Sequence, residues 1–100
     1  MIQETISSNN APVAVGTYSP AVRAGDFIYI SGQLPIDPTT GQLVSDDIRI
    51  QTEQVLKNIE SLLAEAGLNM SYVLKTTVFV KNMEEFAAMN EVYARFFQKP

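Results

Sequence analysis

The residues best suited to chemistry in this sequence follow an apolar, β-branched run at residues 27–30. Ser31 offers a hydroxyl that can donate or accept a hydrogen bond, and Gly32 allows a ligand to approach its bare backbone N–H. Residues 33–35 (Gln-Leu-Pro) then turn the chain away, which would keep a site at this point open. Two interpretations stay open: a strand that ends on a small residue for close packing, or the floor of a binding site.

A second polar group interrupts an apolar stripe in the helix that the pattern predicts over residues 82–97. Four side chains follow the spacing i, i+4, i+7 and i+11, which is one helix face: Phe86, Asn90, Tyr93 and Phe97. Asn90 is the polar member of this stripe. Its amide either bonds to nearby backbone as a buried polar group or faces a pocket and binds a ligand.

Tyr18 and the three arginines are the remaining candidates for binding. The phenol of Tyr18 lies in a predicted loop, where it either orients a water or a carbonyl or packs at the loop edge. Arg23, Arg49 and Arg95 could each clamp a carboxylate, but none lies in a distinctive motif. The sequence shows no nucleophile–base pair, phosphate loop, metal-ligand spacing or nucleotide fingerprint.

Composition excludes several kinds of function. The 100 residues contain no cysteine and no histidine, so disulfides, thiolate chemistry and the commonest general base near neutral pH are absent. A net charge of −4 does not provide the basic surface that nucleic acids require. No apolar run reaches the ~20 residues needed to span a bilayer, and the N-terminus does not resemble a signal peptide. We therefore expect a cytoplasmic protein that has neither nucleic acid nor membrane as a partner and binds no metal.

The elements that must position these candidates form one small domain. A tight turn around Gly25 lies between two β-prone runs and predicts a hairpin. A helix is expected over residues 47–66, where apolar residues recur at helical spacing. Asp46 or Asp47 can cap its start, and Gly67 can end it. The other predicted elements are strands at 2–7 and 72–81, a turn at 38–41 and the helix at 82–97, capped by Asn82.

The predicted strands have no properly polar face. Residues 27–30 place Phe and Tyr on one side and Ile on the other, and residues 77–80 are similarly apolar. Two helices can cover only one face of a sheet, so the second face needs another cover. A second subunit and further chain after Pro100 are the two alternatives, and both can hold.

Three stretches of the sequence together resemble one known family. They are APVAVGTYSPAVRAGDFIYISGQLPIDPTTGQLV, the following helix that ends AEAGL, and KTTVFVKNMEEFAAMNEVYARFF. Their motifs G-x-Y, S-G-Q-x-P and N-x-x-Y-x-x-F-F have the order and spacing found in the RidA family, also called YjgF/YER057c/UK114. The resemblance covers residues 10–97, which is nearly the whole chain.

The resemblance implies a chorismate-mutase-like α/β (α+β) fold with a mixed sheet, two helices on one face, and assembly into a homotrimer with sites at subunit interfaces. It also implies the activity of a 2-iminobutanoate/2-iminopropanoate deaminase. Such an enzyme hydrolyses reactive enamine and imine intermediates, such as 2-aminoacrylate and 2-aminocrotonate, to 2-keto acids and ammonia. The intermediates arise from pyridoxal-phosphate dehydratases, and the family itself uses no cofactor.

Carried over residue by residue, the resemblance makes Tyr18, Ser31 and Asn90 the catalytic candidates. Gly32 matches a position whose backbone N–H can meet the substrate carboxylate, and Phe86 would line the pocket. Tyr18 and Ser31 would hold water or the imine nitrogen, while Asn90 would shape the pocket.

The resemblance also implies parts that these residues do not supply. The family's substrate-clamping arginine, an acidic residue that positions water, and the C-terminal strand would all follow Pro100. We therefore expect residues 1–100 to be one RidA-like domain that is incomplete at its C-terminus and is not active by itself.

Two other functions remain open at the level of sequence, because relatives of one fold can differ in activity. The first is a non-catalytic, chaperone-like trimer that binds a small metabolite such as a keto acid. The second is RNA cleavage, which is attached to some relatives. The acidic charge and the absence of histidine weigh against cleavage of RNA.

Overall fold

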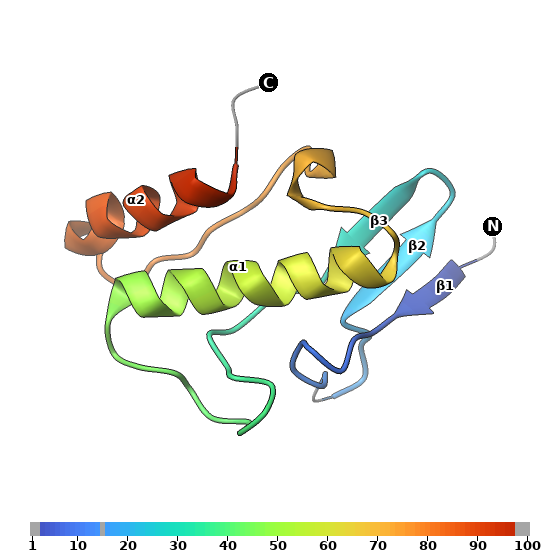
Figure 1. Cartoon of the computed structure of the whole chain (residues 1–100), viewed down its shortest axis with the longest axis horizontal. Helices are drawn as coiled ribbons and strands as arrows, with labels where there is room; N and C mark the ends of the chain where they lie inside the picture. The colour runs from blue at the N-terminus through green and yellow to red at the C-terminus, as the bar shows by residue number, and fades with distance from the viewer. Residues whose placement is uncertain (1–2, 15, 98–100) are drawn as a thin grey trace.

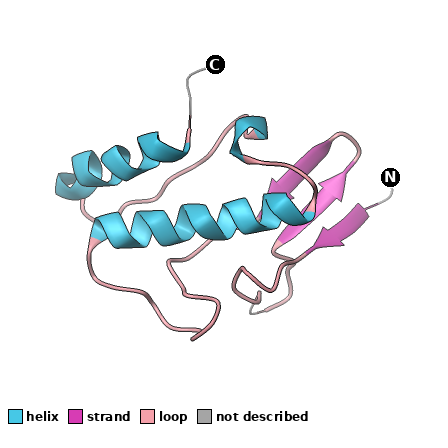
Figure 2. Ribbon diagram, in the orientation of Figure 1, coloured by secondary structure: helices cyan, strands magenta, loops and turns pink. Residues whose placement is uncertain are grey.

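The computed structural model of this chain describes residues 3–14 and 16–97 (Figure 1, Figure 2). Its elements in chain order are β1 (Gln3–Ile6), β2 (Ala21–Ala24), β3 (Phe27–Ile30), α1 (Ile48–Glu65), the 3₁₀ turns η1 (Met70–Tyr72) and η2 (Met83–Glu85), and α2 (Phe86–Phe96). In Figure 1 the C-terminal end of α1 lies over the strands, whereas α2 lies beside the N-terminal part of α1. The fold is therefore a mixed α/β arrangement, as the sequence predicts.

The predicted hairpin is confirmed. The strands pair antiparallel in the order β1-β2-β3, with Ala24 opposite Phe27 across the turn. Gly25 adopts φ +61° in this two-residue turn, a conformation that glycine reaches without a steric penalty. β1 lies within the strand predicted at 2–7 and adds to the open edge of β2.

The predicted helix at 47–66 is confirmed with both of its ends. Asp47 caps α1, and its carboxylate accepts from the backbone N–H groups of Arg49 at 2.7 Å and Ile50 at 3.4 Å. Gly67 follows the helix with φ +76°, and the backbone N–H of Leu68 then donates to the carbonyl of Leu63. This bond is the closing contact of a helix that ends on a left-handed residue.

The predicted C-terminal helix is also confirmed, although it begins with a 3₁₀ turn. The side chain of Asn82 accepts from the backbone N–H of Glu84 and caps η2, as the sequence predicts. The chain then continues directly into α2, whose buried residues are Met89 and Val92.

The strand predicted at 72–81 is wrong. Residues 70–72 form η1, and residues 73–80 are extended but have no strand partner among the described residues. β-Branched residues favour a strand only where another strand supplies the ladder of backbone hydrogen bonds. Here Leu74 and Phe79 instead remain 84% and 93% exposed.

Two details of the expected fold therefore change. The sheet of the described residues is antiparallel throughout and not mixed, since its three strands are all joined antiparallel. The helices do not both cover that sheet, because α2 packs beside α1 and lies away from the strands (Figure 1).

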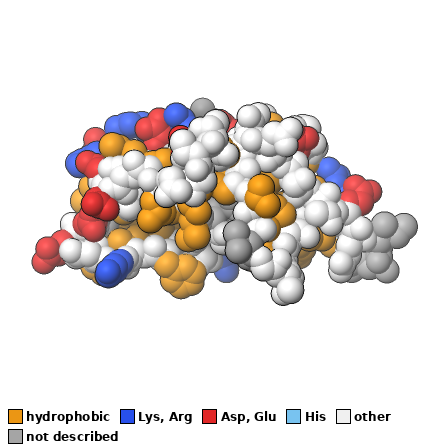
Figure 3. All heavy atoms as spheres, turned by 90° about the horizontal axis from the view of Figure 1, so that it is seen from below, with side chains coloured by type: hydrophobic (Ala, Val, Ile, Leu, Met, Phe, Trp, Pro, Cys, Tyr) orange, Lys and Arg blue, Asp and Glu red, His pale blue; other side chains and the backbone are white. Residues whose placement is uncertain are grey.

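The core lies under the second half of α1. Leu56, Leu63 and Met70 form its buried cluster. Seven partly buried side chains pack against that cluster: Ile30, Ile59, Leu68, Val73, Tyr93, Phe96 and Phe97. On the other side of β3, Phe27 and Tyr29 are more than half exposed, and Figure 3 shows hydrophobic side chains at the surface of one face of the molecule. The apolar second face expected from the sequence is thus uncovered in the single chain.

Candidate functional site

Ser31 is fastened to the loop that precedes the hairpin. Its hydroxyl donates a hydrogen bond of 2.6 Å to the carbonyl of Ser19, and its backbone N–H donates one of 3.0 Å to the carbonyl of Pro20. The side-chain amide of Gln33 donates to the Ser31 carbonyl at 3.1 Å. Because the hydroxyl proton is committed to Ser19, the remaining lone pairs of Ser31 Oγ can only accept from a ligand.

Gly32 lies next to Ser31 and is exposed. A Cβ placed on Gly32 would meet nothing within 4 Å beyond its chain neighbours, so the interpretation of this glycine as a close-packing residue is wrong. No hydrogen bond between described residues uses the Gly32 N–H. This donor is therefore available to an acceptor group on a ligand.

Tyr18 and Gly32 line the same hollow, which we call the Tyr18 hollow. Its volume is about 80 Å³, and its remaining lining residues are Pro12, Val13, Ala14, Pro20, Gln33, Leu34 and Ile36. Tyr18 is 53% exposed, so packing at the loop edge does not bury its ring. None of the described residues that line the hollow is charged. Binding in the hollow therefore depends on neutral hydrogen-bonding groups and on the backbone.

A larger hollow adjoins it on the loop between β1 and β2. Its volume is about 340 Å³, and Tyr18 lines it together with several residues that carry hydroxyl or amide groups: Thr5, Ser7, Ser8, Asn9 and Ser19. Tyr18 thus stands between two neutral, polar hollows. The phenol is the one side chain with a titratable group that lines either of them among the described residues.

Phe86 and Asn90 are not brought to these hollows. Both lie on α2 and are exposed, and neither lines the hollows around Tyr18. The buried-amide interpretation of Asn90 is therefore wrong. The two ends of the helix stripe differ in burial. Phe86 and Asn90 are exposed, whereas Tyr93 and Phe97 pack against the core with their ring centroids 4.5 Å apart. One chain thus unites Tyr18, Ser31 and Gly32 but leaves Phe86 and Asn90 on a separate surface.

Sequence reasoning missed Asn58, which hydrogen-bonds to residues 34–36. This segment forms one wall of the Tyr18 hollow. Asn58 is 0% exposed on α1, and its side-chain N–H groups donate to the carbonyls of Leu34 at 3.2 Å and Ile36 at 3.1 Å. Its carbonyl oxygen accepts from the side chain of Gln54 at 2.8 Å. The available signal was its position, because Asn58 lies four residues before Leu62 on the apolar face of the helix.

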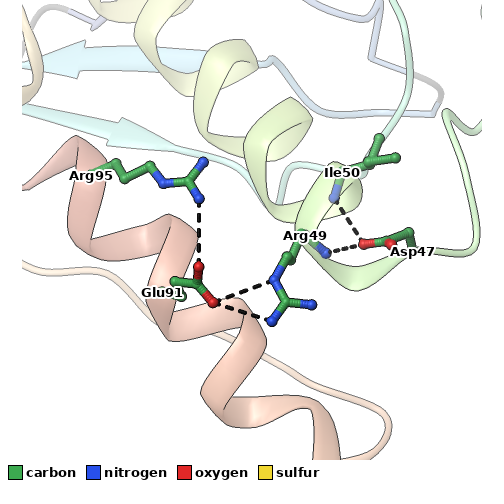
Figure 4. A network of polar contacts seen from close by, with 5 residues as sticks. All are labelled: Asp47, Arg49, Ile50, Glu91 and Arg95. Carbon is green, nitrogen blue, oxygen red and sulfur yellow. Dashed lines mark hydrogen bonds and ion pairs between the residues drawn. The ribbon is translucent and has the colours of Figure 1, made fainter.

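The arginines are held by structural partners. Glu91 on α2 accepts from Arg49 at 3.2 Å and pairs with Arg95 at 3.7 Å, which joins the start of α1 to α2 (Figure 4). The guanidinium of Arg23 contacts the carbonyl of Ala66 at 3.5 Å. Since none of the three lines the Tyr18 hollow, no arginine of the described residues supplies a carboxylate clamp there.

Asp37 lies in the turn that follows residues 34–36, and its carboxylate is hydrogen-bonded within that turn. Asp37 Oδ1 accepts from the hydroxyl of Thr39 at 2.6 Å and from its backbone N–H at 2.8 Å. These two hydrogen bonds to the ionised form hold the pKa of Asp37 below its ordinary value. The bonds stabilise the predicted turn, which an isolated bridge between Ile36 and Leu43 closes.

Two other kinds of site are not found in the part of the chain that the structure describes. No group of three or more acidic, histidine or cysteine residues is arranged to hold a metal ion within it. Within the same residues, no helix has the length and apolar character needed to cross a membrane.

Comparison with known proteins links this geometry to one family. A family model described as endoribonuclease L-PSP matches residues 8–100. A RutC family protein of Pyrococcus horikoshii is 51% identical over 96 residues, which are 96% of this chain and 76% of the relative. The chloroplastic Reactive Intermediate Deaminase A of Arabidopsis thaliana is 41% identical over 98 residues, 98% of this chain and 52% of that protein.

Solved structures show the same fold. A Rid-family protein of unknown function from Yersinia pestis superimposes with a TM-score of 0.94 at 43% identity, over 97% of this chain and 77% of its own. TdcF of E. coli, solved with bound serine, gives a TM-score of 0.89 at 36% identity, over 94% and 73% of the two chains. The resemblance seen in the motifs thus extends to the three-dimensional structure.

Proposed function

Because this chain belongs to the Rid (RutC, YjgF) family, for which the matching family model is described as endoribonuclease L-PSP, we propose that it hydrolyses reactive enamine and imine intermediates to 2-keto acids and ammonia. The observation that carries the proposal is the Gly32 N–H, which has no hydrogen-bond partner among the described residues. Gly32 follows Ser31, whose hydroxyl is fixed, and lines a hollow together with Tyr18. The relative named as a deaminase supports the reaction class.

We propose a direction for each hydrogen bond in this reaction. The Gly32 N–H donates to the substrate carboxylate, while Ser31 Oγ accepts from the N–H of the imine or from the attacking water. Tyr18 supplies a phenol that can donate to the same water or to the nitrogen. The water oxygen bonds to the imine carbon while one water proton passes to the nitrogen, which gives a carbinolamine. The second proton of that water then passes to the nitrogen as the C–N bond breaks, so that ammonia leaves and the 2-keto acid remains. An imine carbon is already electrophilic, so positioned neutral groups suffice and no strong nucleophile is needed.

We propose that a neighbouring subunit of a homotrimer supplies the second half of the site. Phe86 and Asn90 are exposed on α2 and lie away from the Tyr18 hollow of their own chain. Phe27 and Tyr29 form an apolar surface on β3 that such an assembly would cover. In this arrangement Phe86 of one copy lines the pocket of the next, and Asn90 shapes it.

We also propose that an arginine after Pro100, where the family resemblance places it, clamps the substrate carboxylate. Among the described residues that line the hollow, none is a cation that could do so. The bound serine in TdcF shows that a protein of this fold accepts a small molecule carrying a carboxylate and an amino nitrogen. An imino acid presents the same two groups in similar positions.

The test is release of 2-keto acid from a serine or threonine dehydratase reaction, with and without the full-length protein. We expect the protein to accelerate this release. Ser31→Ala should lower the acceleration about tenfold, which corresponds to one lost hydrogen bond to the reacting groups. The matched control is Ser61→Ala, because Ser61 donates only to its own helix at Lys57. An unaccelerated dehydratase reaction would exclude the deaminase.

A non-catalytic trimer that binds a small metabolite is the second candidate. The neutral lining of the Tyr18 hollow favours it, because the described residues place no general base other than the Tyr18 phenol there. In that case calorimetric titration with a keto acid would show binding, while keto-acid release from the dehydratase would not change. We do not propose RNA cleavage, despite the description of the family model, because the chain has a net charge of −4 and no histidine.

A further inference from the structure

We propose that Asn58 is a positioning residue for the substrate site, acting through the segment at residues 34–36 with Gln54 as its support. The side chain of Asn58 is completely buried and bonds to two carbonyls of this segment, those of Leu34 and Ile36. A buried amide whose two N–H groups both donate to carbonyls of one loop fixes the position of that loop.

The orientation of the Asn58 amide is set by its partners. Two carbonyl oxygens face it on the loop side and can only accept, so the NH2 group must point toward them. The oxygen of the amide then points to Gln54, one helical turn earlier, which donates to it at 2.8 Å. The hydrogen bond from Gln54 therefore opposes rotation of the Asn58 amide, which would break the bonds to the carbonyls of Leu34 and Ile36.

The bonded segment is held by its own backbone as well as by Asn58, since the backbone N–H of Val44 donates to the carbonyl of Pro35 at 3.0 Å. The carbonyl of Leu34 also accepts from the backbone N–H of Ile36 at 2.8 Å. For the carbonyl of Ile36, Asn58 is the hydrogen-bond partner among the described residues. Removal of the amide would leave that part-buried carbonyl without its donor from α1, so we expect the loop to move toward water.

Movement of this loop would change the site. Leu34 and Ile36 line the Tyr18 hollow together with Gly32, whereas Asn58 does not line it. Because Gly32 lies two residues before Leu34, a shift of the wall redirects the Gly32 N–H that would meet the substrate carboxylate. Asn58 would thus affect substrate binding without touching the substrate, and this consequence rests on the proposed function.

The experiment compares Asn58→Asp and Gln54→Met with Thr52→Val in the full-length protein. Asn58→Asp keeps the side-chain shape but replaces the two donors with an acceptor. Thr52 is a matched control, because it is a buried polar residue of the same helix whose hydroxyl donates only to Ile48. For each variant we measure hydrogen exchange at the hydrogen-bonded backbone amides of Ile36, Asp37 and Val44, and the steady-state constants for imine hydrolysis.

We expect exchange of these three amides to rise about tenfold or more in Asn58→Asp, less in Gln54→Met, and to stay near the wild-type value in Thr52→Val. KM should rise about tenfold while kcat changes less than about threefold, because the misplaced N–H contacts the carboxylate both before and during reaction. A purely structural defect lowers the amount of folded enzyme, and so lowers the apparent kcat and leaves KM unchanged.

The two proposals can fail separately. If wild-type protein does not accelerate keto-acid release, the proposed function is wrong and the exchange measurement alone decides the role of Asn58. Equal exchange in Asn58→Asp and Thr52→Val, or a fall in apparent kcat at constant KM, would overturn the positioning role. If Asn58→Asp does not fold, Gln54→Met decides by the same two measurements, since the half-buried side chain of Gln54 hydrogen-bonds to Asn58 and not to residues 34–36 among the described hydrogen bonds.

Discussion

Ser31 and Asn90 are both polar candidates for one site, but the structure holds them in very different ways. Ser31 is tied to the preceding loop through its hydroxyl and its backbone N–H, and Asn58 fastens the wall beyond it. Asn90 lies exposed on α2, and its side chain has no hydrogen bond within residues 3–14 and 16–97. One half of the proposed site is fixed inside the chain, and the other half is presented on its surface.

This difference indicates which groups of the proposed site are held in position before a ligand binds. Rigid groups lose less entropy when a ligand binds, so the fixed half can provide most of the orientation. The exposed half gains a fixed position only when something packs against α2. Substitutions should therefore destabilise the chain on the Ser31 side and leave its stability unchanged at Asn90, and the following predictions measure that contrast.

The largest effect is expected for Asn58→Leu. Leucine keeps a branched side chain but removes three hydrogen bonds at a completely buried position. The free energy of unfolding should fall by about 3 kcal/mol, since buried carbonyls lose their donors. Urea unfolding checks this, with Thr52→Val expected to lose about 1 kcal/mol or less. Equal losses in the two variants would mean that the fixed half does not depend on Asn58.

Ser31→Ala should have the next largest effect. It removes the donor to the Ser19 carbonyl in a half-buried setting, which should cost about 1 to 2 kcal/mol of unfolding free energy. Ser31→Thr retains the hydroxyl and should recover most of the loss. Ser61→Ala is the control and should change stability by less than about 0.5 kcal/mol, because alanine is favoured in helices. A loss in Ser61→Ala as large as in Ser31→Ala would contradict the contrast.

Tyr93→Phe and Thr76→Val test the boundary between the two halves. The hydroxyls of Tyr93 and Thr76 hydrogen-bond to each other and tie the unpaired segment 73–80 to α2. A double-mutant cycle should give a coupling of about 1 kcal/mol. Thr76→Ser keeps the hydroxyl and should lose less. Additive losses would show that α2 is not fastened to the segment in this way.

A smaller effect, confined to acid, is expected at Asp37. Its pKa is lowered from the ordinary 3.8 by the hydroxyl and then the backbone N–H of Thr39. The folded state thus favours the ionised form, so this stabilisation is complete above the unfolded pKa and is lost as pH falls through the lower folded pKa. Unfolding measured across this acid range should be less pH-dependent in Asp37→Asn. An unchanged pH dependence would show that the turn does not hold the ionised form.

The sequence predicted most of the fold because its signals are local. The hairpin turn at Gly25, the Asp47 cap and the helix end at Gly67 each depend on residues that are neighbours in the chain. The strand at 72–81 failed because a strand also needs a partner backbone, which β-propensity cannot report. The burial of a helix stripe depends in the same way on what packs against it.

The site was less predictable than the fold. Ser31, Gly32 and Tyr18 were candidates by residue type, but only the family motifs placed them in one candidate site, because spacing alone does not predict that the loop before a hairpin lies beside the end of its second strand. Asn58 was missed because its partners lie 22 and 24 residues earlier, in a loop with no regular structure. A polar residue on the apolar face of a helix is a signal of a buried contact, but it does not say which segment is contacted.

Asn90→Ala should have the smallest effect on stability and so tests the contrast most directly. An exposed helix residue without hydrogen bonds in the described chain should change the unfolding free energy by less than about 0.5 kcal/mol. In the keto-acid assay the same variant should lose activity, because the amide would serve the site of a neighbouring copy. Glu91→Gln is the control on the same helix: it breaks exposed ion pairs to Arg49 and Arg95, costs less than about 1 kcal/mol, and should leave hydrolysis unchanged. Normal activity in Asn90→Ala would remove α2 from the site, whereas a large loss of stability would show that Asn90 is as fixed as Ser31.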